Sequence, residues 1–196
     1  MKASFFKRLS AYFIDIMFVS IVAGIISAGF SSTRYQKAYE EYENLMEQYT
    51  NMQITVGEYV DKVGPVIYDM QESSVIVTVI TVTLSIAYFI VFQYLNKGQT
   101  LGKRMLRLKV CEKGKDPSLK AIIIRTIIID SILSGTFGII LLYILNKNNY
   151  YFGYSIVSML EMTFVFVSAL FILYRKDKLG LHDIMAHTEV IDERGN

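Results

Sequence analysis

Four long apolar stretches constrain the fold of this chain more than any other feature. They cover about residues 6–30, 66–95, 121–145 and 155–174. Each supplies the roughly 20 residues that a helix needs to cross a ~30 Å hydrocarbon core. Strands in isolation would leave backbone groups unpaired in lipid, so the spans must be helices. The sequence therefore predicts an all-α membrane protein, a single domain over residues 1–196 built as a four-transmembrane-helix bundle.

Composition agrees with a membrane protein and excludes a disulfide scaffold. The chain has 196 residues, of which 53% are hydrophobic, and a mean hydropathy of +0.36. Cys111 is the single cysteine, so no intramolecular disulfide is possible. The N-terminal stretch is similar to a signal peptide, but Asp15 interrupts its apolar core and the run is too long. We therefore expect an uncleaved first helix.

The distribution of Lys and Arg predicts the orientation. Residues 1–10 carry three positive charges and residues 96–120 carry eight, whereas residues 146–154 carry only Lys147. Residues 31–73 hold three positive and eight negative charges. Because Lys and Arg concentrate in cytoplasmic loops, both termini and the 96–120 loop are expected in the cytoplasm.

The first outer loop, residues 31–65, is expected to form an acidic helical hairpin. Apolar residues recur in it at alternating spacings of three and four, which indicates one face of a helix: Tyr35, Ala38, Tyr42, Leu45, Tyr49 and Met52. Thr55 and Glu58 have the spacing of a capping box that opens a second, short helix. Pro65 suits the first turn of the next membrane helix. The tyrosine stripe either packs within the hairpin and the headgroups or docks a partner protein.

The basic loop contains a sequence that resembles a phosphate-binding loop, with Gly98, Thr100, Gly102 and Lys103. The spacing between its glycines is one residue short, and Arg104 stands where Ser or Thr would bind magnesium, so nucleotide binding is not expected. Residues 106–110 alternate apolar and basic side chains, which predicts a short strand, and residues 188–191 could form a second. These strands would join the loop to the tail as a small sheet.

Charged residues inside the apolar stretches are the strongest functional candidates. Asp15, Arg125 and Asp130 interrupt two of them, and such residues usually face a bundle interior, a partner charge or water. Arg8 and Asp15 are seven residues apart and share one helix face. Asp15 either carries protons or fixes helix packing through a partner such as Arg125. Arg125 and Asp130 point to different sides of their helix and should find separate partners.

The remaining polar residues predict neither an enzyme nor a cofactor. His182, Asp183 and His187 match no metal-ligand spacing, and no catalytic Ser-His-Asp or Cys-His arrangement is readable. The basic loop lacks interleaved aromatic residues, so an anionic lipid leaflet explains it better than nucleic acid does.

An ordered set of segments resembles the RDD family of small bacterial membrane proteins, named for one Arg and two Asp. The set comprises residues 8–15, 98–104 and 108–110, then Arg125 with Asp130, then residues 181–188. The resemblance implies that the named residues are Arg8, Asp15 and Asp183, and that the protein is a multi-pass protein of the bacterial plasma membrane. The long outer loop and the four spans depart from the usual family pattern.

The resemblance also implies two alternative functions. Some members are similar to sodium or potassium/proton antiporters, and others act as accessory proteins that regulate membrane enzymes or envelope stress responses. Our leading prediction is proton-coupled transport of a monovalent cation, with Asp15 as carrier, Asp130 as a second site and Arg8 or Arg125 as the competing charge. Four helices enclose little volume, so transport would need a homodimer.

The alternative is a non-catalytic accessory protein with a membrane-protein partner. A cavity reaching Asp15 and Asp130 would favour transport, and a dry, fully paired arrangement would favour the accessory role.

Overall fold

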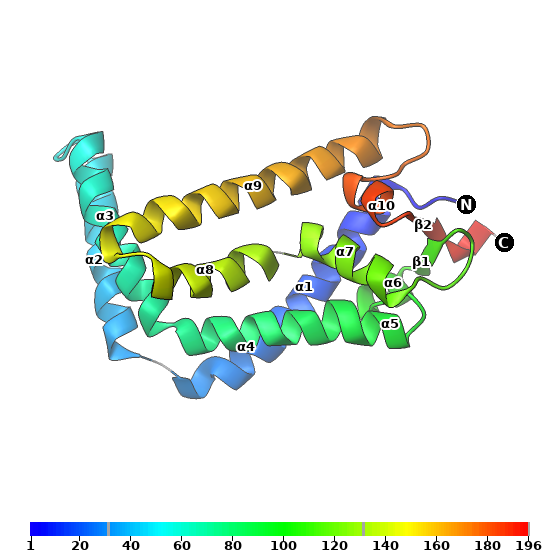
Figure 1. Cartoon of the computed structure of the whole chain (residues 1–196), viewed down its shortest axis with the longest axis horizontal. Coiled ribbons are helices and arrows are strands. Elements are labelled where there is room, and N and C mark those ends of the chain that lie inside the picture. Colours follow the sequence, from blue (N-terminus) through cyan, green and yellow to red (C-terminus); the bar gives the residue numbers. More distant parts are fainter. Residues whose placement is uncertain (31, 131, 196) are drawn as a thin grey trace.

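The computed structural model describes residues 1–30, 32–130 and 132–195. Long helices lie side by side along the molecule, with a small sheet and both chain termini at one end and a helical hairpin across the other (Figure 1). We call these the sheet end and the hairpin end.

Three helical segments of the described chain are long and apolar enough to cross a membrane. They are α1 (Phe5–Ser27) with the short η1 (Ala28–Phe30), α4 (Val75–Ile86) with η2 (Ala87–Phe92) and α5 (Gln93–Leu95), and α9 (Lys147–Tyr174). A fourth span forms if α7 (Leu119–Ile129) and α8 (Ile132–Ile144), which meet at an angle of 71°, cross together. The third apolar stretch is therefore a broken helix and not the continuous one that its sequence predicts.

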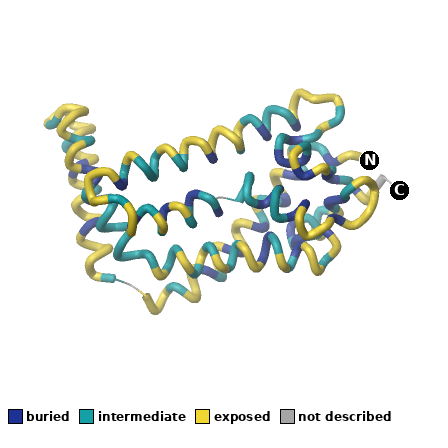
Figure 2. The backbone as a smooth tube through the Cα atoms, viewed as in Figure 1, coloured by how far each residue is buried: buried dark blue, intermediate teal, exposed yellow. Residues whose placement is uncertain are grey.

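The surface of the long helices is suited to lipid. Large apolar side chains are exposed along them, for example Phe13, Ile25, Met159 and Phe166. Buried residues concentrate instead at the sheet end (Figure 2). The hydrocarbon of a membrane would cover the exposed apolar side chains, which is the usual arrangement for a polytopic helical protein.

The outer hairpin is longer than predicted. It consists of α2 (Thr33–Thr50) and α3 (Val56–Ser73), so the apolar span after it begins at Val75 and not near residue 66. The capping box is confirmed: the Thr55 backbone N–H donates to Glu58 Oε2 at 2.8 Å, and the Glu58 N–H donates to Thr55 Oγ1 at 3.3 Å. Starting from this cap, α3 runs through Pro65 to Ser73, so the prediction that Pro65 opens the membrane helix is wrong.

The tyrosine stripe of α2 packs mainly within the hairpin. Ala38 and Leu45 are buried, and the Tyr49 ring stacks on Tyr59 of α3 with centroids 4.9 Å apart. α3 in turn packs against α9 (Figure 1). The hairpin is thereby fixed across the ends of the long helices.

The predicted small sheet is confirmed, so the fold is mostly helical but not purely so. β1 (Leu108–Glu112) pairs antiparallel with β2 (Thr188–Asp192), with Val110 opposite Val190. Ala3, Ala11 and Leu108 complete a compact apolar core beneath this pair. The sheet joins the loop after the second span to the tail after α9.

The order of elements repeats along the chain. A span that runs away from the sheet end is followed by one that returns, then by a five-residue helix and a five-residue strand. The five-residue helices are α6 (Leu101–Met105) and α10 (Leu181–Met185). Each is followed by a residue in the left-handed region, Arg107 with φ 54° and His187 with φ 53°, which turns the chain into its strand. The outer hairpin is an insertion in the first half, where the second half has only a short connection.

Candidate functional site

The sheet end holds a cluster of buried charges centred on Asp183. This side chain has no exposed surface and lies in the first turn of α10. Arg8 of α1 donates to its Oδ2 at 2.6 Å, and Arg125 of α7 donates to its Oδ1. The Gly180 N–H and the Thr188 hydroxyl add bonds of 3.2 Å and 3.4 Å. One carboxylate therefore holds three helices and the start of β2 together.

The surroundings keep Asp183 ionised. Burial alone would raise the pKa of this carboxyl, but the positive charges of Arg125 and Arg8 hold the pKa well below its usual range. Arg8 also donates to the backbone oxygens of Ala3 and Val190 at 3.3 Å and 3.5 Å, which ties the N-terminal segment to β2. The cluster is therefore a buried ion network that joins α1, α7 and α10.

His182 completes this cluster as a neutral side chain. Burial and the charge of Arg125 lower the pKa of His182 to about 4, so the imidazole is uncharged near pH 7. Its Nδ1 lies 2.5 Å from the Ser168 hydroxyl of α9. Among the described residues, no group of three or more His, Cys, Asp or Glu side chains is placed to hold a metal ion.

Asp15 is also fully buried, but it has different partners. It accepts hydrogen bonds from the Tyr88 hydroxyl at 2.6 Å, the Thr100 hydroxyl at 2.5 Å and the Gly102 N–H at 2.7 Å. Thr100 is the N-cap of α6, and Lys103 Nζ donates to its hydroxyl at 3.3 Å. The loop that resembles a phosphate-binding loop thus encloses a carboxylate of its own chain.

The two glycines of this loop are required by close backbone contacts. A Cβ on Gly102 would lie 2.2 Å from the Ala11 carbonyl oxygen, so only glycine lets α6 approach α1 this closely. Gly98 has φ +91°, and a Cβ there would lie 2.4 Å from the Val110 carbonyl oxygen. Gly102 therefore serves the dock between α6 and α1, whereas Gly98 lets the loop turn tightly against β1 and Pro117, and the sequence motif is explained without a bound phosphate.

The predicted pairing of Asp15 with Arg125 does not occur in the described structure. Arg125 turns to Asp183, where it meets Arg8. Asp15 is instead satisfied by hydroxyl and backbone donors from the second span and α6. The reason is the repeated architecture: Asp15 of α1 binds the first five-residue helix, while Arg8 of α1 binds the second.

These positions lie within the segments that define a known family. The sequence matches the RDD family over residues 2–187, from before Arg8 to beyond Asp183. The chain belongs to the RDD family. No curated protein and no solved structure matches it. RDD proteins are membrane proteins, so this one is a multi-pass membrane protein, as its apolar helices indicate. The residues that the resemblance makes the namesakes of the family, Arg8, Asp15 and Asp183, all join helices at the sheet end.

Asp130 is not a hydrogen-bond partner in either network of this RDD protein, although Lys103, Arg125 and Tyr12 interact with it electrostatically. It is the last described residue before the break between α7 and α8. Its Oδ1 is buried, and no described residue provides that atom with a hydrogen-bond partner. The hydroxyl of Tyr12, on α1, donates to the neighbouring carbonyl of Ile129 at 3.0 Å. Asp130 thus lies near the middle of the long helices, and one of its carboxylate oxygens is able to accept a further hydrogen bond.

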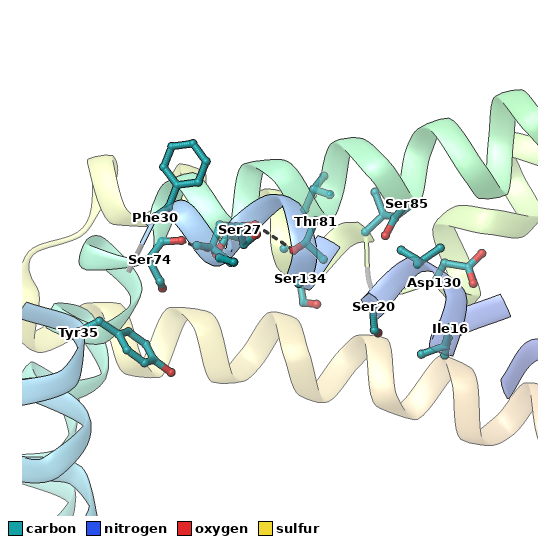
Figure 3. A pocket seen from close by; sticks show the side chains of 18 of the residues that line it. Ile16, Ser20, Ser27, Phe30, Tyr35, Ser74, Thr81, Ser85, Asp130 and Ser134 are labelled. Carbon is teal, nitrogen blue, oxygen red and sulfur yellow. Dashed lines mark hydrogen bonds between the residues drawn. The ribbon is translucent and has the colours of Figure 1, made fainter. Parts of the chain in front are cut away.

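A large cavity of about 870 Å³ extends from Asp130 toward the hairpin end, between α1, α4 and α8 (Figure 3). Asp130 is the only acidic or basic side chain among the described residues that line it. Figure 3 shows Phe30, Tyr35 and Ser74 at the opposite end of the cavity from Asp130. Hydroxyl side chains line the space between, from α1, the end of α3 and the second span: Ser20, Ser27, Ser73, Ser74, Thr78, Thr81 and Ser85.

A second cavity, of about 170 Å³, lies on the other side of Asp130 toward the sheet end. Arg8, Lys103, Arg125 and His182 line it together with Asp130. Burial lowers the pKa of Lys103. Both cavities share Tyr12, Phe89 and Asp130, whereas Asp15 and Asp183 line neither of the two. The sequence prediction named Asp130 but missed the aromatic pair, because nothing in the pattern distinguishes Tyr12 and Phe89 from other aromatic residues of these helices.

Proposed function

We propose that this RDD protein exchanges a monovalent cation for protons across the membrane, and that Asp130 is the carboxylate that binds each in turn. The observation that carries this proposal is the place of Asp130, which lines both cavities and has an unpartnered buried oxygen. A buried ionisable group between two cavities is the usual mark of an ion or proton route in a membrane protein.

The broken helix and the repeated order of elements give further support. Transporters commonly bind their ions where a membrane helix is interrupted near the bilayer centre and where two structural repeats meet. Non-helical backbone at that depth is tolerated where it lines a cavity. In this chain the break between α7 and α8 follows Asp130, at the boundary of the two cavities.

Asp15 has a supporting role in this proposal and is not the carrier. Three donors already occupy its carboxylate, and a cation would have to displace them. Arg8 and Arg125 are similarly engaged by Asp183. Lys103, which lines the smaller cavity with Asp130, is the competing positive charge in the proposed exchange.

The orientation follows the positive charges. Both termini and the sheet lie at one end of the molecule, and this end carries the eight Lys and Arg of residues 96–120 (Figure 1). We place it in the cytoplasm of a bacterial cell and the acidic hairpin outside. One copy of the chain holds the large cavity between its own helices, so the homodimer suggested by the small number of spans is not part of this proposal.

Ion flux in proteoliposomes tests the proposal. Wild-type protein should release protons from the lumen when a monovalent cation is added outside, and the cations to compare are sodium, lithium, potassium and an organic ammonium ion. Asp130→Asn should abolish this flux while the protein stays folded, because one oxygen of this carboxylate is buried without a hydrogen-bond partner among the described residues. Asp15→Asn is the matched control: an amide cannot accept all three bonds, so stability should fall while the folded fraction still exchanges ions.

Two results would overturn the proposal. One is the absence of cation-dependent flux in folded wild-type protein, and the other is unchanged flux in Asp130→Asn.

The acidic hairpin favours a second candidate function, that of an accessory protein. Glu40, Glu41, Glu43 and Glu47 of α2 are exposed, and this helix packs chiefly on α3. Such a face could bind a basic region of a membrane enzyme. Deletion of residues 35–63 should then abolish co-purification with that enzyme from a crosslinked membrane. Unchanged co-purification after the deletion would exclude the hairpin as the binding surface.

A further inference from the structure

Asp130 has two aromatic neighbours at the junction of the cavities. Tyr12 and Phe89 line both cavities with it, and their ring centroids are 6.2 Å apart with an angle of 42° between the planes. Phe89 lies in the π-helical segment η2, where it packs edge-to-face against Tyr88. The faces of aromatic rings attract cations, and quaternary ammonium groups are recognised in this way. The junction therefore combines one carboxylate with two aromatic rings.

The size of the large cavity argues for an organic cation. Its volume of about 870 Å³ lies within the roughly 300–1,000 Å³ of cavities that bind organic molecules. A hard metal cation needs several oxygen ligands at short distance. In the described part of the chain, no group of three or more His, Cys, Asp or Glu side chains is placed to hold a metal ion. An ammonium ion needs only one opposite charge and an apolar or aromatic wall.

The walls of the cavity are mixed in a way that suits an amphiphilic ligand. Apolar side chains from α1, η1, the second span and α8 line it together with the hydroxyls already described: Ile16, Val19, Phe30, Val77, Val82 and Ile132. An apolar body could lie against these side chains over the length of the cavity, from Asp130 to the hairpin end (Figure 3). The hydroxyls would leave room for polar substituents or water.

We infer that the large cavity binds an organic ammonium ion with an apolar body, its charged head at Asp130 and against the rings of Tyr12 and Phe89. The inference deepens the proposed function, because it names the class of cation that Asp130 exchanges, but binding can be measured without transport. The apolar body then lies along the cavity from Asp130 toward Phe30 and Tyr35.

Calorimetry on the full chain in lipid nanodiscs tests the inference, with benzyldimethyloctylammonium as the probe and benzyl octyl ether as its uncharged counterpart. Empty nanodiscs correct for partition into lipid. The ammonium should bind at one saturable site, and Asp130→Asn should weaken it at least about tenfold, since a buried counter-charge is lost. The ether should bind weakly to both proteins. Phe89→Leu should reduce the preference for the ammonium over the ether, which a change in folding alone would not do.

A glycine on the cavity wall provides a steric test. Gly24 lines the large cavity, and a Cβ there would meet no atom within 4 Å, so Gly24→Phe should fill space without disturbing the helix. This variant should abolish ammonium binding. Gly57→Phe, at a hairpin glycine with equally open surroundings that is not among the lining residues, is the matched control and should bind normally.

The outcomes separate the two proposals. Equal binding of the ammonium and the ether, or unchanged binding in Asp130→Asn or Gly24→Phe, would overturn the inference. Ammonium binding without any cation-dependent proton flux would support the inference and overturn the proposed exchange. Sodium or potassium exchange through Asp130 without ammonium binding would do the reverse.

Discussion

Buried carboxylates differ in the number of their hydrogen-bond partners between the sheet end and the cavity region. At the sheet end, Asp183 accepts bonds from two arginines and two further donors, and Asp15 accepts three. In the cavity region, Asp130 keeps a buried oxygen that no described residue contacts by a hydrogen bond. A buried charge is tolerated when its partners compensate for the lost water, and an uncompensated one persists where function requires it. The comparison gives the first region a structural role and is the basis for the proposed exchange in the second.

The difference also explains why the resemblance to the family pointed first to Asp15. The family pattern names charged residues by their positions in the sequence, and here Arg8, Asp15 and Asp183 join α1 to the two five-residue helices. Such a dock fixes both repeats to one helix. Asp130, which has an unpartnered buried oxygen, lies in the same pattern but outside this dock.

The largest effect should follow when the sheet-end network loses its charge. Asp183→Asn leaves Arg8 and Arg125 without their shared carboxylate, and breaking a buried ion pair typically costs roughly 3–5 kcal/mol. We expect a large fall in the melting temperature in detergent and a lower yield of folded protein. Asp177→Asn is the matched control, because Asp177 pairs with Arg175 at the exposed surface, where ion pairs add little.

This pair of variants tests whether the two regions have the different roles proposed for them. Equal melting temperatures for Asp183→Asn and Asp177→Asn would mean that the buried network does not stabilise the fold. A loss of cation flux in Asp183→Asn protein that melts like the wild type would assign exchange to the sheet end.

Much of this fold follows from local patterns in the sequence. The apolar stretches, the Thr55–Glu58 capping box, the two strands and the helical stripe of α2 each depend on residues close in the chain, and the structure has all of them. The start of the second span was misplaced because Val66, Ile67 and Tyr68 extend the apolar run, although Asp69 and Glu72 mark the following residues as part of the hairpin. The cap at Thr55 and the turn at Ser74 bound α3, and the latter has no distinctive sequence.

The candidate site was less predictable because its partners are distant in the chain. Helical spacing correctly separated Arg125 from Asp130 but could not show that Arg125 and Arg8 share Asp183, which lies far away in sequence. The repeat of α6–β1 in α10–β2 has a weak trace, since Leu101, Met105 and Val110 have counterparts in Leu181, Met185 and Val190. A search for internal repeats would have paired the two segments. The cavity itself depends on side chains from several helices, which no linear pattern reveals.

The smallest effect on stability should come from the contacts among Lys7, Asp192 and Arg194, which we call the rim of the sheet end. This effect should depend on pH. Lys7 and the Arg194 backbone N–H both donate to Asp192 and lower the pKa of this carboxyl to about 2, below the value near 3.9 of an unfolded chain. A depressed folded pKa contributes stability above the unfolded pKa and loses it as the pH falls through the folded value. Asp192→Asn should therefore melt slightly below wild type at pH 5–7, and the difference should shrink between about pH 4 and about pH 2. Melting curves in detergent over this range provide the measurement. A difference that stays constant with pH would mean that the carboxylate charge of Asp192 does not stabilise the rim, and that the packing of β2 against the N-terminal segment accounts for it alone.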